Sequence, residues 1–299
     1  MLGLERNFQN MKPVVDAIAS RYSCRTFSDR KIEEEVLDSI LQAALNAASG
    51  GNLQPVSVIV VKDDQRKKEL CELCDGQGFI EDASVNLIFC MDWHKYDVYT
   101  QYKEAPFVAN RSFAHFMIAV EDVMCMAQTV ETVSYLYGIG SCYVGSVVDY
   151  IKEVSDFLKL PDKVFPVVML SLGYPKVIPK NRLKKLPKEM MICDETYTAY
   201  AKEEICKAYD EKYEGRSLPV SKNEEKAAEM LDTFYQCLLT TYSKEEADAM
   251  LQRVKECGKF DETQRRFGLH YAAAEMLAVG VQMQKDMKER GLDVFEQQK

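Results

Sequence analysis

The longest helical pattern in the chain, Phe113–Tyr137, is apolar on most of its sides. A helix with so little polar surface must be largely buried, either in a large core or across a subunit interface. The sequence therefore predicts a domain that is large or dimeric. The apolar positions are Ile118, Val120, Val123, Met124, Met126, Ala127, Val130, Val133 and Leu136.

Strand and helix patterns alternate along the first two thirds of the chain. Runs of β-branched and other apolar residues predict buried strands at Val56–Lys62, Ser84–Met91 and Val164–Gly173, and a strand or loop at Ser141–Val147. Helical periodicity predicts helices at Val14–Ser20, Ile32–Ala48, Gln65–Cys74 and Tyr150–Leu160, with Ser28 or Asp29 as N-cap of the second. Such alternation favours an α/β or α+β class.

The pattern changes at about Ser217. Three helical patterns follow without a convincing strand: Asn223–Tyr242, Glu245–Cys257 and Thr263–Arg290. Ser243 and Glu246 have the spacing of a capping box at the middle helix. We therefore predict two domains, residues 1–216 and a helical C-terminal extension of residues 217–299.

Composition narrows the class of protein. The 299 residues are 47% hydrophobic and 28% charged, which is typical of a soluble globular chain. A net charge of −9 argues against sequence-independent nucleic-acid binding, which needs a basic stripe. We find no apolar run near the roughly 20 residues of a membrane helix and no signal-peptide pattern, so we expect no membrane partner and a cytoplasmic location.

The chain has ten cysteines but only one C-x-x-C pair, Cys71 and Cys74. A zinc site usually needs a second pair or nearby histidines, and His94, His115 and His270 are far apart in the sequence. Free thiols in a reducing compartment are favoured over disulfides or zinc, and no metal site is predicted.

The segment Arg21-Tyr-Ser-Cys-Arg-Thr-Phe27 has a pattern suited to binding an anion. Alternate side chains of an extended segment point the same way, so Arg21, Ser23 and Arg25 share a face, and Phe27 follows on it. Two guanidinium groups flanking a hydroxyl can bind phosphate. The alternative is an exposed polar strand with two solvated arginines.

Four later segments extend this pattern: Ala48–Pro55, Gly76–Ile80, Tyr137–Ser146 and Pro179–Leu183. In this order the five segments resemble the flavin-dependent nitroreductase family, in particular its NAD(P)H:flavin and nitroaromatic reductase branch. The resemblance covers roughly Met11–Arg216. It departs from the family pattern at Ala48 (usually Pro), Gly50 (usually Ser) and Val56 (usually aromatic), and we expect FMN affinity to be reduced but kept.

The resemblance implies an FMN site. Arg21, Ser23, Arg25, Lys180 and Arg182 would hold the phosphate, and independently a nearly dianionic group needs several cations to offset its desolvation. A solvated basic loop is the alternative for Lys176–Lys188. Asn52 and Gln77 would face the pyrimidine ring, and backbone amides at Gly145 and Ser146 the rest of the flavin. The full implied set is Arg21, Tyr22, Ser23, Arg25, Ser49, Gly50, Asn52, Gln77, Tyr143, Val144, Gly145, Ser146, Lys180 and Arg182.

By the same resemblance, the fold is an α+β nitroreductase-like sandwich, with a central, mostly antiparallel sheet surrounded by helices, in an intertwined homodimer. FMN would lie at the dimer interface, with Ser49–Asn52 supplied largely by the second chain. The reaction would pass hydride from NAD(P)H through FMN to a nitroaromatic, quinone or flavin acceptor in two steps, and no protein residue is assigned as catalytic.

Two alternatives remain at this point. The same flavin could serve dehalogenation or the oxidation of an amide or azoline. A non-enzymatic flavin-binding protein could instead use the helical extension as a partner surface, although we favour an extension that widens the dimer contact or covers the pocket. The sequence leaves open the physiological acceptor, the choice between NADH and NADPH, and one- or two-electron transfer.

Overall fold

The computed structural model describes residues 8–179 and 182–295. The contacts divide the chain into two compact units, residues 1–179 with 282–299, and residues 180–281. The predicted division at residue 216 stays a prediction, and the boundary between compact units falls earlier in the sequence.

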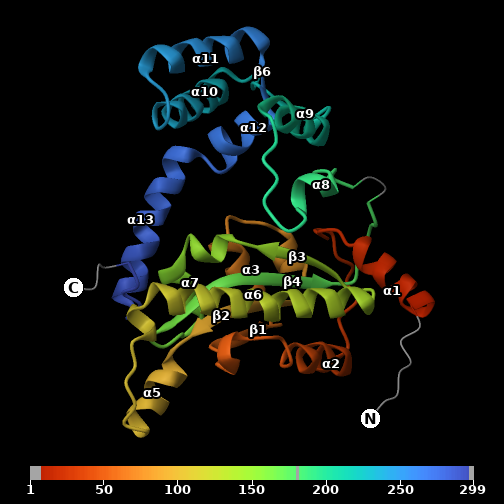
Figure 1. Cartoon of the computed structure of the whole chain (residues 1–299), viewed down its shortest axis with the longest axis vertical. Coiled ribbons are helices and arrows are strands. Elements are labelled where there is room, and N and C mark those ends of the chain that lie inside the picture. Colours follow the sequence, from red (N-terminus) through yellow and green to blue (C-terminus); the bar gives the residue numbers. More distant parts are fainter. Residues whose placement is uncertain (1–7, 180–181, 296–299) are drawn as a thin grey trace. The chain divides into compact units, whose positions relative to one another are not determined.

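The first unit is built on a four-stranded antiparallel sheet with the order β1-β2-β4-β3 (Figure 1). Its strands are β1 (Val56–Val61), β2 (Val85–Asp92), β3 (Gly140–Val144) and β4 (Val164–Gly173). Strand β4 has the predicted bounds, and every residue of β2 is buried, as expected for a central strand. The prediction of a buried β1 is wrong, because β1 forms an edge of the sheet and is mostly half-exposed.

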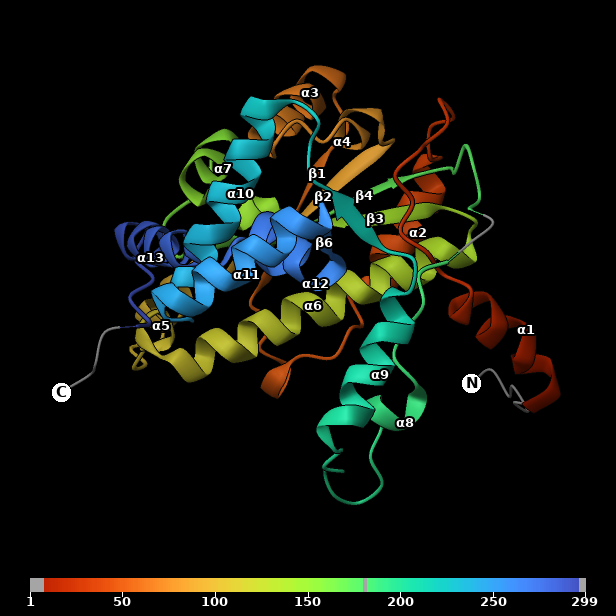
Figure 2. The ribbon, with the colours of Figure 1, turned by 90° about the horizontal axis from the view of Figure 1, so that it is seen from above.

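Helices cover both faces of this sheet (Figure 2). On one face, α6 (Phe113–Leu136) contacts all four strands and packs against α2 (Glu34–Ala44). On the other face lie α3 (Asp64–Leu73), α4 (Phe79–Asp82) and α7 (Ile151–Leu158). Each face has its own cluster of buried apolar side chains, so the sheet is the middle of three layers.

The remaining elements of the first unit are short or peripheral. They are α1 (Phe8–Ala19), η1 (Gly50–Asn52), α5 (His94–Tyr102), η2 (Ala109–Arg111) and η3 (Ser146–Val148). The N-cap of α2 is Glu33, without a side-chain hydrogen bond, so the prediction of a Ser28 or Asp29 cap is wrong.

Helix α6 corrects the expectation that no segment has the composition of a membrane span. Phe113–Leu136 is long enough and, with a mean hydropathy of 1.2, apolar enough to cross a membrane by length and composition alone. However, Asp122 and Glu131 are buried on it, and the helix contacts all four strands of the sheet.

The second unit is mostly helical. Its elements are α8 (Lys188–Met191), α9 (Lys202–Tyr213), β5 (Ser217–Pro219), α10 (Glu224–Leu239), α11 (Lys244–Cys257), β6 (Lys259–Asp261), α12 (Glu262–Arg265), the π-helical turn η4 (Arg266–His270) and α13 (Ala273–Glu289), whose last turns belong to the first unit. Figure 1 shows α10 and α11 side by side. The capping box of Ser243 and Glu246 is confirmed.

Two predictions for this unit are wrong. The region contains strands, because β5 and β6 pair antiparallel. The single helix predicted over Thr263–Arg290 is broken after α12 by the π-helical turn. At that turn Gly268 packs against the Phe234 ring, where an added Cβ would lie 2.3 Å from Cδ2. Close packing of this kind outweighs helical periodicity.

A buried ion-pair cluster stabilises the same turn. The Glu262 side chain is only 3% exposed, and its two oxygens accept from Arg216, Arg265 and Arg266 at 2.9–3.0 Å. The Arg265 hydrogen bonds, helped by the charges of the other two arginines, lower the pKa of Glu262 to about 2, although burial opposes this shift.

After the second unit the chain returns to the first one. Leu292 and Val294 are buried in the core cluster on the α6 face. Arg290 donates through Nη2 to the Leu160 carbonyl (2.6 Å), and its own carbonyl accepts from the Lys163 N–H (2.8 Å). Residues at the end of the sequence thus complete the core of the first unit.

The fold class is therefore confirmed as α+β, with an antiparallel sheet surrounded by helices and a helical C-terminal part. All ten cysteines are free thiols. In the described parts of the chain no cluster of His, Cys, Asp and Glu has the geometry of a metal site.

Candidate functional site

The segment that carries Arg21 and Arg25, residues Arg21–Phe27, is called the arginine segment and lies along the β3 edge of the sheet. Ser23 forms a parallel bridge with Ser141 on β3, and the Cys24 N–H donates to the Ser141 carbonyl (2.7 Å). Further on, Phe27 bridges Pro175. The backbone of this segment is therefore fixed on the sheet.

Two glycines that face each other across the strands, Gly140 on β3 and Gly173 on β4, make room for this segment. An added Cβ at Gly140 would lie 2.7 Å from the Cys24 Cβ, and one at Gly173 would lie 2.8 Å from the Phe27 ring. Cys24 and Phe27 are accordingly buried. We infer that the missing side chains allow the segment to lie directly on the sheet.

The predicted common face is correct only in part. Ser23 and Arg25 are exposed and Arg21 is half-buried, but Phe27 points into the core. The segment bridges the sheet only at Ser23 and Phe27, so it is not a regular strand and strict alternation fails along it.

The two arginines differ in their surroundings. Arg21 Nη1 lies 2.9 Å from Oε1 of the buried Glu131 on α6. Arg25 is exposed, with its guanidinium 5.9 Å from the centre of the Phe79 ring. Burial raises the pKa of the Cys142 thiol on β3, while Arg25 and Arg21 both lower it, which places both cations near this end of the sheet.

Four predicted cofactor residues lie at the end of β3 and in the loop that follows it. On β3, Tyr143 is half-buried and Val144 is buried; in the loop, Ser146 is buried and Gly145 is exposed, with no atom of the described residues within 4 Å of an added Cβ. Gln77 joins this loop, because its Nε2 donates to Ser146 Oγ (3.2 Å). The structure therefore brings Gln77 and the loop together and leaves the Gln77 carbonyl oxygen as an acceptor for a ligand N–H.

Two tyrosines complete this region. The Tyr143 hydroxyl is buried and has no hydrogen-bond partner among the described residues. Its pKa is raised by burial and by the charge of Glu131, while Arg21 lowers it. Tyr22 packs edge-on against Tyr135, with ring centroids 6.4 Å apart. A buried hydroxyl without a partner is costly, so it marks a place where a polar ligand atom would be stabilising.

The loop Ser49–Asn52 contacts a different part of α6. The Gly50 N–H donates to Asp122 Oδ1 (2.8 Å), and Gly51 and Asn52 have left-handed φ values of 57° and 56°. Burial raises the pKa of Asp122, and the hydrogen bond from Gly50 opposes that shift. The Ser49 hydroxyl is buried without a partner among the described residues. Within one chain, this loop and the arginine segment are separate contacts of α6.

Gly50 departs from the family pattern, and there is a steric reason for a glycine at this position. An added Cβ at Gly50 would lie 2.7 Å from Ile118 Cγ2 on α6. We therefore predict that Gly50→Ser lowers the free energy of unfolding by about 1–3 kcal/mol, the usual cost of overpacking. Chemical denaturation of Gly50→Ser with and without Ile118→Ala tests this. Shortening Ile118 removes the overlap, so it should recover most of the stability lost in Gly50→Ser. Equal stability of Gly50→Ser and the parent protein would contradict the steric explanation.

Sequence reasoning missed Asp122 and Glu131. Both are acidic residues within an otherwise apolar helix, and a buried carboxylate must be paired or hydrogen-bonded. That signal was present in the sequence, and it indicates that each residue has a partner on another segment. The structure identifies these partners as Gly50 and Arg21.

The phosphate contacts predicted for Lys180 and Arg182 stay a prediction. Lys180 lies outside the described residues, and Arg182 is an exposed residue of the second unit. A shared phosphate site for Arg25 and Arg182 stays a prediction.

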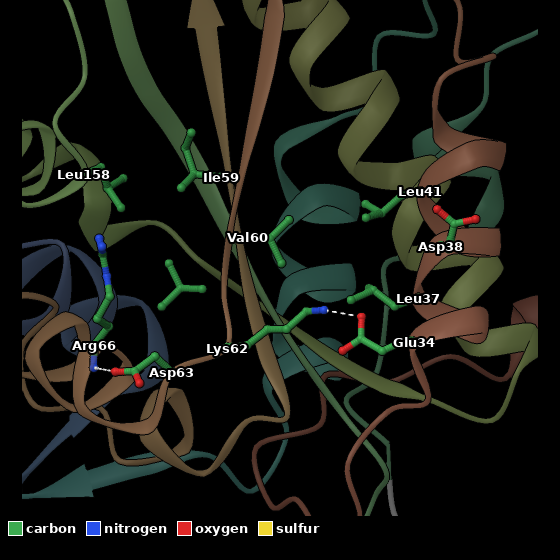
Figure 3. Close-up of a pocket in the computed structure, with 11 residues that line it drawn as sticks. Glu34, Leu37, Asp38, Leu41, Ile59, Val60, Lys62, Asp63, Arg66 and Leu158 are labelled. Carbon is green, nitrogen blue, oxygen red and sulfur yellow. Dashed lines mark hydrogen bonds and ion pairs between the residues drawn. The ribbon is translucent and has the colours of Figure 1, made fainter.

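A separate cavity of about 560 Å³ lies at the opposite edge of the sheet, beside β1 (Figure 3). Lys62 on its wall forms an ion pair with Glu34, and Arg66 projects from α3. Of the predicted flavin residues that the structure describes, none lines this cavity. Its position between α2 and α3 makes it a feature of the exposed strand edge rather than of the candidate site.

Comparison with known proteins identifies the family. The family model described as "Nitroreductase family" matches residues 18–174, more than half of the 299-residue chain. The chain belongs to the nitroreductase family. The matched region holds the whole sheet, the arginine segment and the loop after β3, so these parts of the candidate site lie within the nitroreductase domain.

Individual nitroreductase relatives are distant. An enzyme from Bacillus subtilis (strain 168) named "FMN reductase [NAD(P)H]" is 29% identical over 188 residues, which are 62% of this chain and 75% of the relative. The structure of the Vibrio harveyi NADPH:FMN oxidoreductase complexed with NAD+ is 26% identical, has a TM-score of 0.61, and covers 66% of this chain and 83% of that one.

A second solved structure with this fold matches the second unit as well. Bacillus megaterium NfrA2 has a TM-score of 0.71 at 23% identity and covers 96% of this chain and 100% of that one. At this identity the match shows the fold alone, and it includes the helical C-terminal part.

Proposed function

We propose that the protein is an FMN-dependent oxidoreductase that takes hydride from NAD(P)H and reduces a nitroaromatic, quinone or flavin acceptor. Membership of the nitroreductase family and the FMN and NADPH reductases among its relatives support this class of reaction. The observation that carries the proposal is the position of the segment with Arg21 and Arg25. This segment lies along β3, next to the loop whose Ser146 is hydrogen-bonded to Gln77.

The side chains present fit an FMN site. Arg25 is exposed and Arg21 keeps N–H donors beyond the one bound to Glu131, so both can contact a phosphate. Gly145 leaves space for a ring to approach the backbone, and Gln77 presents an acceptor beside it. The buried hydroxyls of Ser49 and Tyr143 have no hydrogen-bond partner in the described part of the chain, and a ligand could supply one. The resemblance implies that Lys180 and Arg182 would add further phosphate contacts, and this stays a prediction.

Bound FMN would accept hydride from NAD(P)H and pass it to the second substrate in a two-step exchange. The chain's own residues bind the flavin, orient it and shield it. Arg21, Ser23 and Arg25 hold the phosphate end, and Gln77 with the loop after β3 holds the ring end. No side chain needs to act as an obligatory acid or base. The shape of the pocket would then determine which donor and which acceptor can bind.

A homodimer is part of this proposal. Helix α6 exposes apolar side chains that one chain leaves uncovered: Phe113, Met117, Met124 and Leu136. Exposed apolar surface of this kind is typical of subunit interfaces. The Ser49–Asn52 loop packs against the same helix through Asp122, so pairing two α6 helices would bring the loop of one chain towards the site of the other. Sedimentation velocity tests the dimer.

The phosphate contact can be tested with Arg25→Gln. Removing an exposed cation that binds a phosphate should weaken FMN binding by about tenfold, while riboflavin, which lacks the phosphate, should bind as before. Flavin fluorescence titrations give both dissociation constants. NADH and NADPH oxidation with a quinone acceptor should fall when FMN is limiting and recover when it is added in excess.

Arg66→Gln is the matched control, because Arg66 also lies over an aromatic ring, Phe157, but belongs to α3 and the β1 side of the sheet. It should leave both flavin affinities unchanged. An equal loss of FMN and riboflavin affinity in Arg25→Gln would contradict the phosphate assignment. FMN binding without anaerobic reduction by NADH or NADPH would favour the non-enzymatic alternative.

A further inference from the structure

Glu131 is a buried carboxylate that lies next to the arginine segment, Arg21–Phe27. Its side chain is 2% exposed, although it lies on an otherwise apolar helix. Three groups donate to it: Arg21 Nη1 (2.9 Å) and Ser141 Oγ (3.2 Å) to Oε1, and Gln128 Nε2 (2.8 Å) to Oε2. Desolvating a carboxylate is costly, and these donors offset that cost.

The contacts fix the orientation of Arg21. Gln128 belongs to the same helix as Glu131, and Ser141 belongs to β3, where it also bridges Ser23. The carboxylate therefore joins α6, β3 and the arginine segment at one point. An arginine side chain has many rotamers in solution, and a fixed ion pair removes most of them before a ligand arrives.

The same contact changes the charge of the site. An Arg21 guanidinium beside a carboxylate contributes little net positive charge, which leaves Arg25 as the exposed cation of the segment. A phosphate that binds to Arg21 also lies near Glu131, and like charges at short range repel in a partly desolvated site. The influence of Glu131 reaches beyond Arg21, because its charge raises the pKa of both Tyr143 and Cys142.

We infer that Glu131 is a positioning residue that aligns Arg21 and at the same time weakens the binding of the flavin phosphate. This inference rests on the proposed FMN site. It makes the protein a weak discriminator between flavins with and without a phosphate. Such a site suits a flavin that exchanges with the solution more than one that is held permanently.

A purely structural role for Glu131 predicts something different. Loss of a structural carboxylate would lower stability and weaken FMN and riboflavin equally. The ratio of the riboflavin to the FMN dissociation constant separates the two roles, because it isolates the contribution of the phosphate.

The experiment compares the parent protein with Glu131→Gln in titrations of apoprotein with FMN and riboflavin. Glutamine keeps an oxygen that accepts from Arg21 but removes the negative charge. We expect FMN affinity to rise about tenfold with riboflavin affinity unchanged, and a steeper decrease of FMN affinity with salt. Glu34→Gln is the control, because it removes one negative charge from an ion pair with Lys62 at the β1 edge. It should leave the ratio unchanged.

A second comparison keeps the inference testable if Glu131→Gln alone is unstable, because together with Arg21→Gln it replaces the ion pair by two neutral partners and leaves no unpaired charge. In a protein that already carries Arg21→Gln, the addition of Glu131→Gln should again raise FMN affinity relative to riboflavin, because an unpaired carboxylate repels the phosphate more strongly. An unchanged ratio in both backgrounds would overturn the inference. If Arg25→Gln shifts the ratio and Glu131→Gln does not, only the inference fails. If neither shifts it, the proposed phosphate site fails.

Discussion

Replacing Glu262 with glutamine is expected to destabilise the helical unit by about 3–5 kcal/mol, because the change leaves three arginines around a buried neutral side chain. Arg216, Arg265 and Arg266 all contact the carboxylate at 2.9–3.0 Å, and no other acidic side chain is bonded to them in the described residues. Chemical denaturation of the full chain, followed by circular dichroism, measures the effect. Glu245→Gln, an exposed position on α11, is the control and should change stability little.

Acid should act through the same carboxylate. The folded protein lowers the pKa of Glu262 from its ordinary value of 4.5 to about 2, so the stabilisation is present above pH 4.5. It is lost as the pH falls from about 5 towards 2, when the carboxylate takes up a proton. Glu262→Gln should therefore be less sensitive to acid over that range than the parent protein. A parallel loss of stability in both proteins would show that other carboxylates dominate.

Gly173→Ala is the second change with a large expected effect. The new Cβ would meet three atoms of Phe27, its Cβ included, at 2.8–3.1 Å, so a rotation of the ring cannot relieve the overlap. We expect the arginine segment to detach from β3, with a loss of about 3 kcal/mol in stability, near the upper end for overpacking, and purification of the protein without flavin. The absorbance spectrum of the purified protein measures flavin content directly.

A matched control and a rescue sharpen this test. Gly280→Ala adds the same methyl group on α13, where no atom of residues 8–179 and 182–295 lies within 4 Å, and should be harmless. Phe27→Ala combined with Gly173→Ala removes the overlap and should recover part of the flavin content. Full FMN occupancy in Gly173→Ala with an unchanged melting temperature would refute the view that the glycine seats the segment.

The parts of the fold that the sequence predicted well are those with local causes. Strand β4 and helix α6 were recognised from continuous apolar runs, and the capping box at Ser243 from the spacing of two residues. The predictions were wrong where tertiary contacts determine the local structure. The break at Arg266–His270 depends on Gly268 packing under Phe234, and the exposure of β1 depends on the order of strands in the sheet.

The candidate site shows the same division. Motif order indicated Arg21, Ser23, Arg25 and Gln77, and the structure seats the arginine segment on β3 and joins Gln77 to Ser146. The inward turn of Phe27 could not be predicted, because it depends on the space above Gly173, far along the chain. The ion pair of Glu131 with Arg21 was likewise hidden, since a charged residue on a helix gives no sign of which segment it meets.

The return of the chain to its first unit has a consequence for biosynthesis. Leu292 and Val294 fill the core beside α6, and the Lys163 N–H is bonded to the Arg290 carbonyl. These residues are synthesised after the whole of the second unit. Until then the nascent sheet has an unfinished core, which this later segment completes.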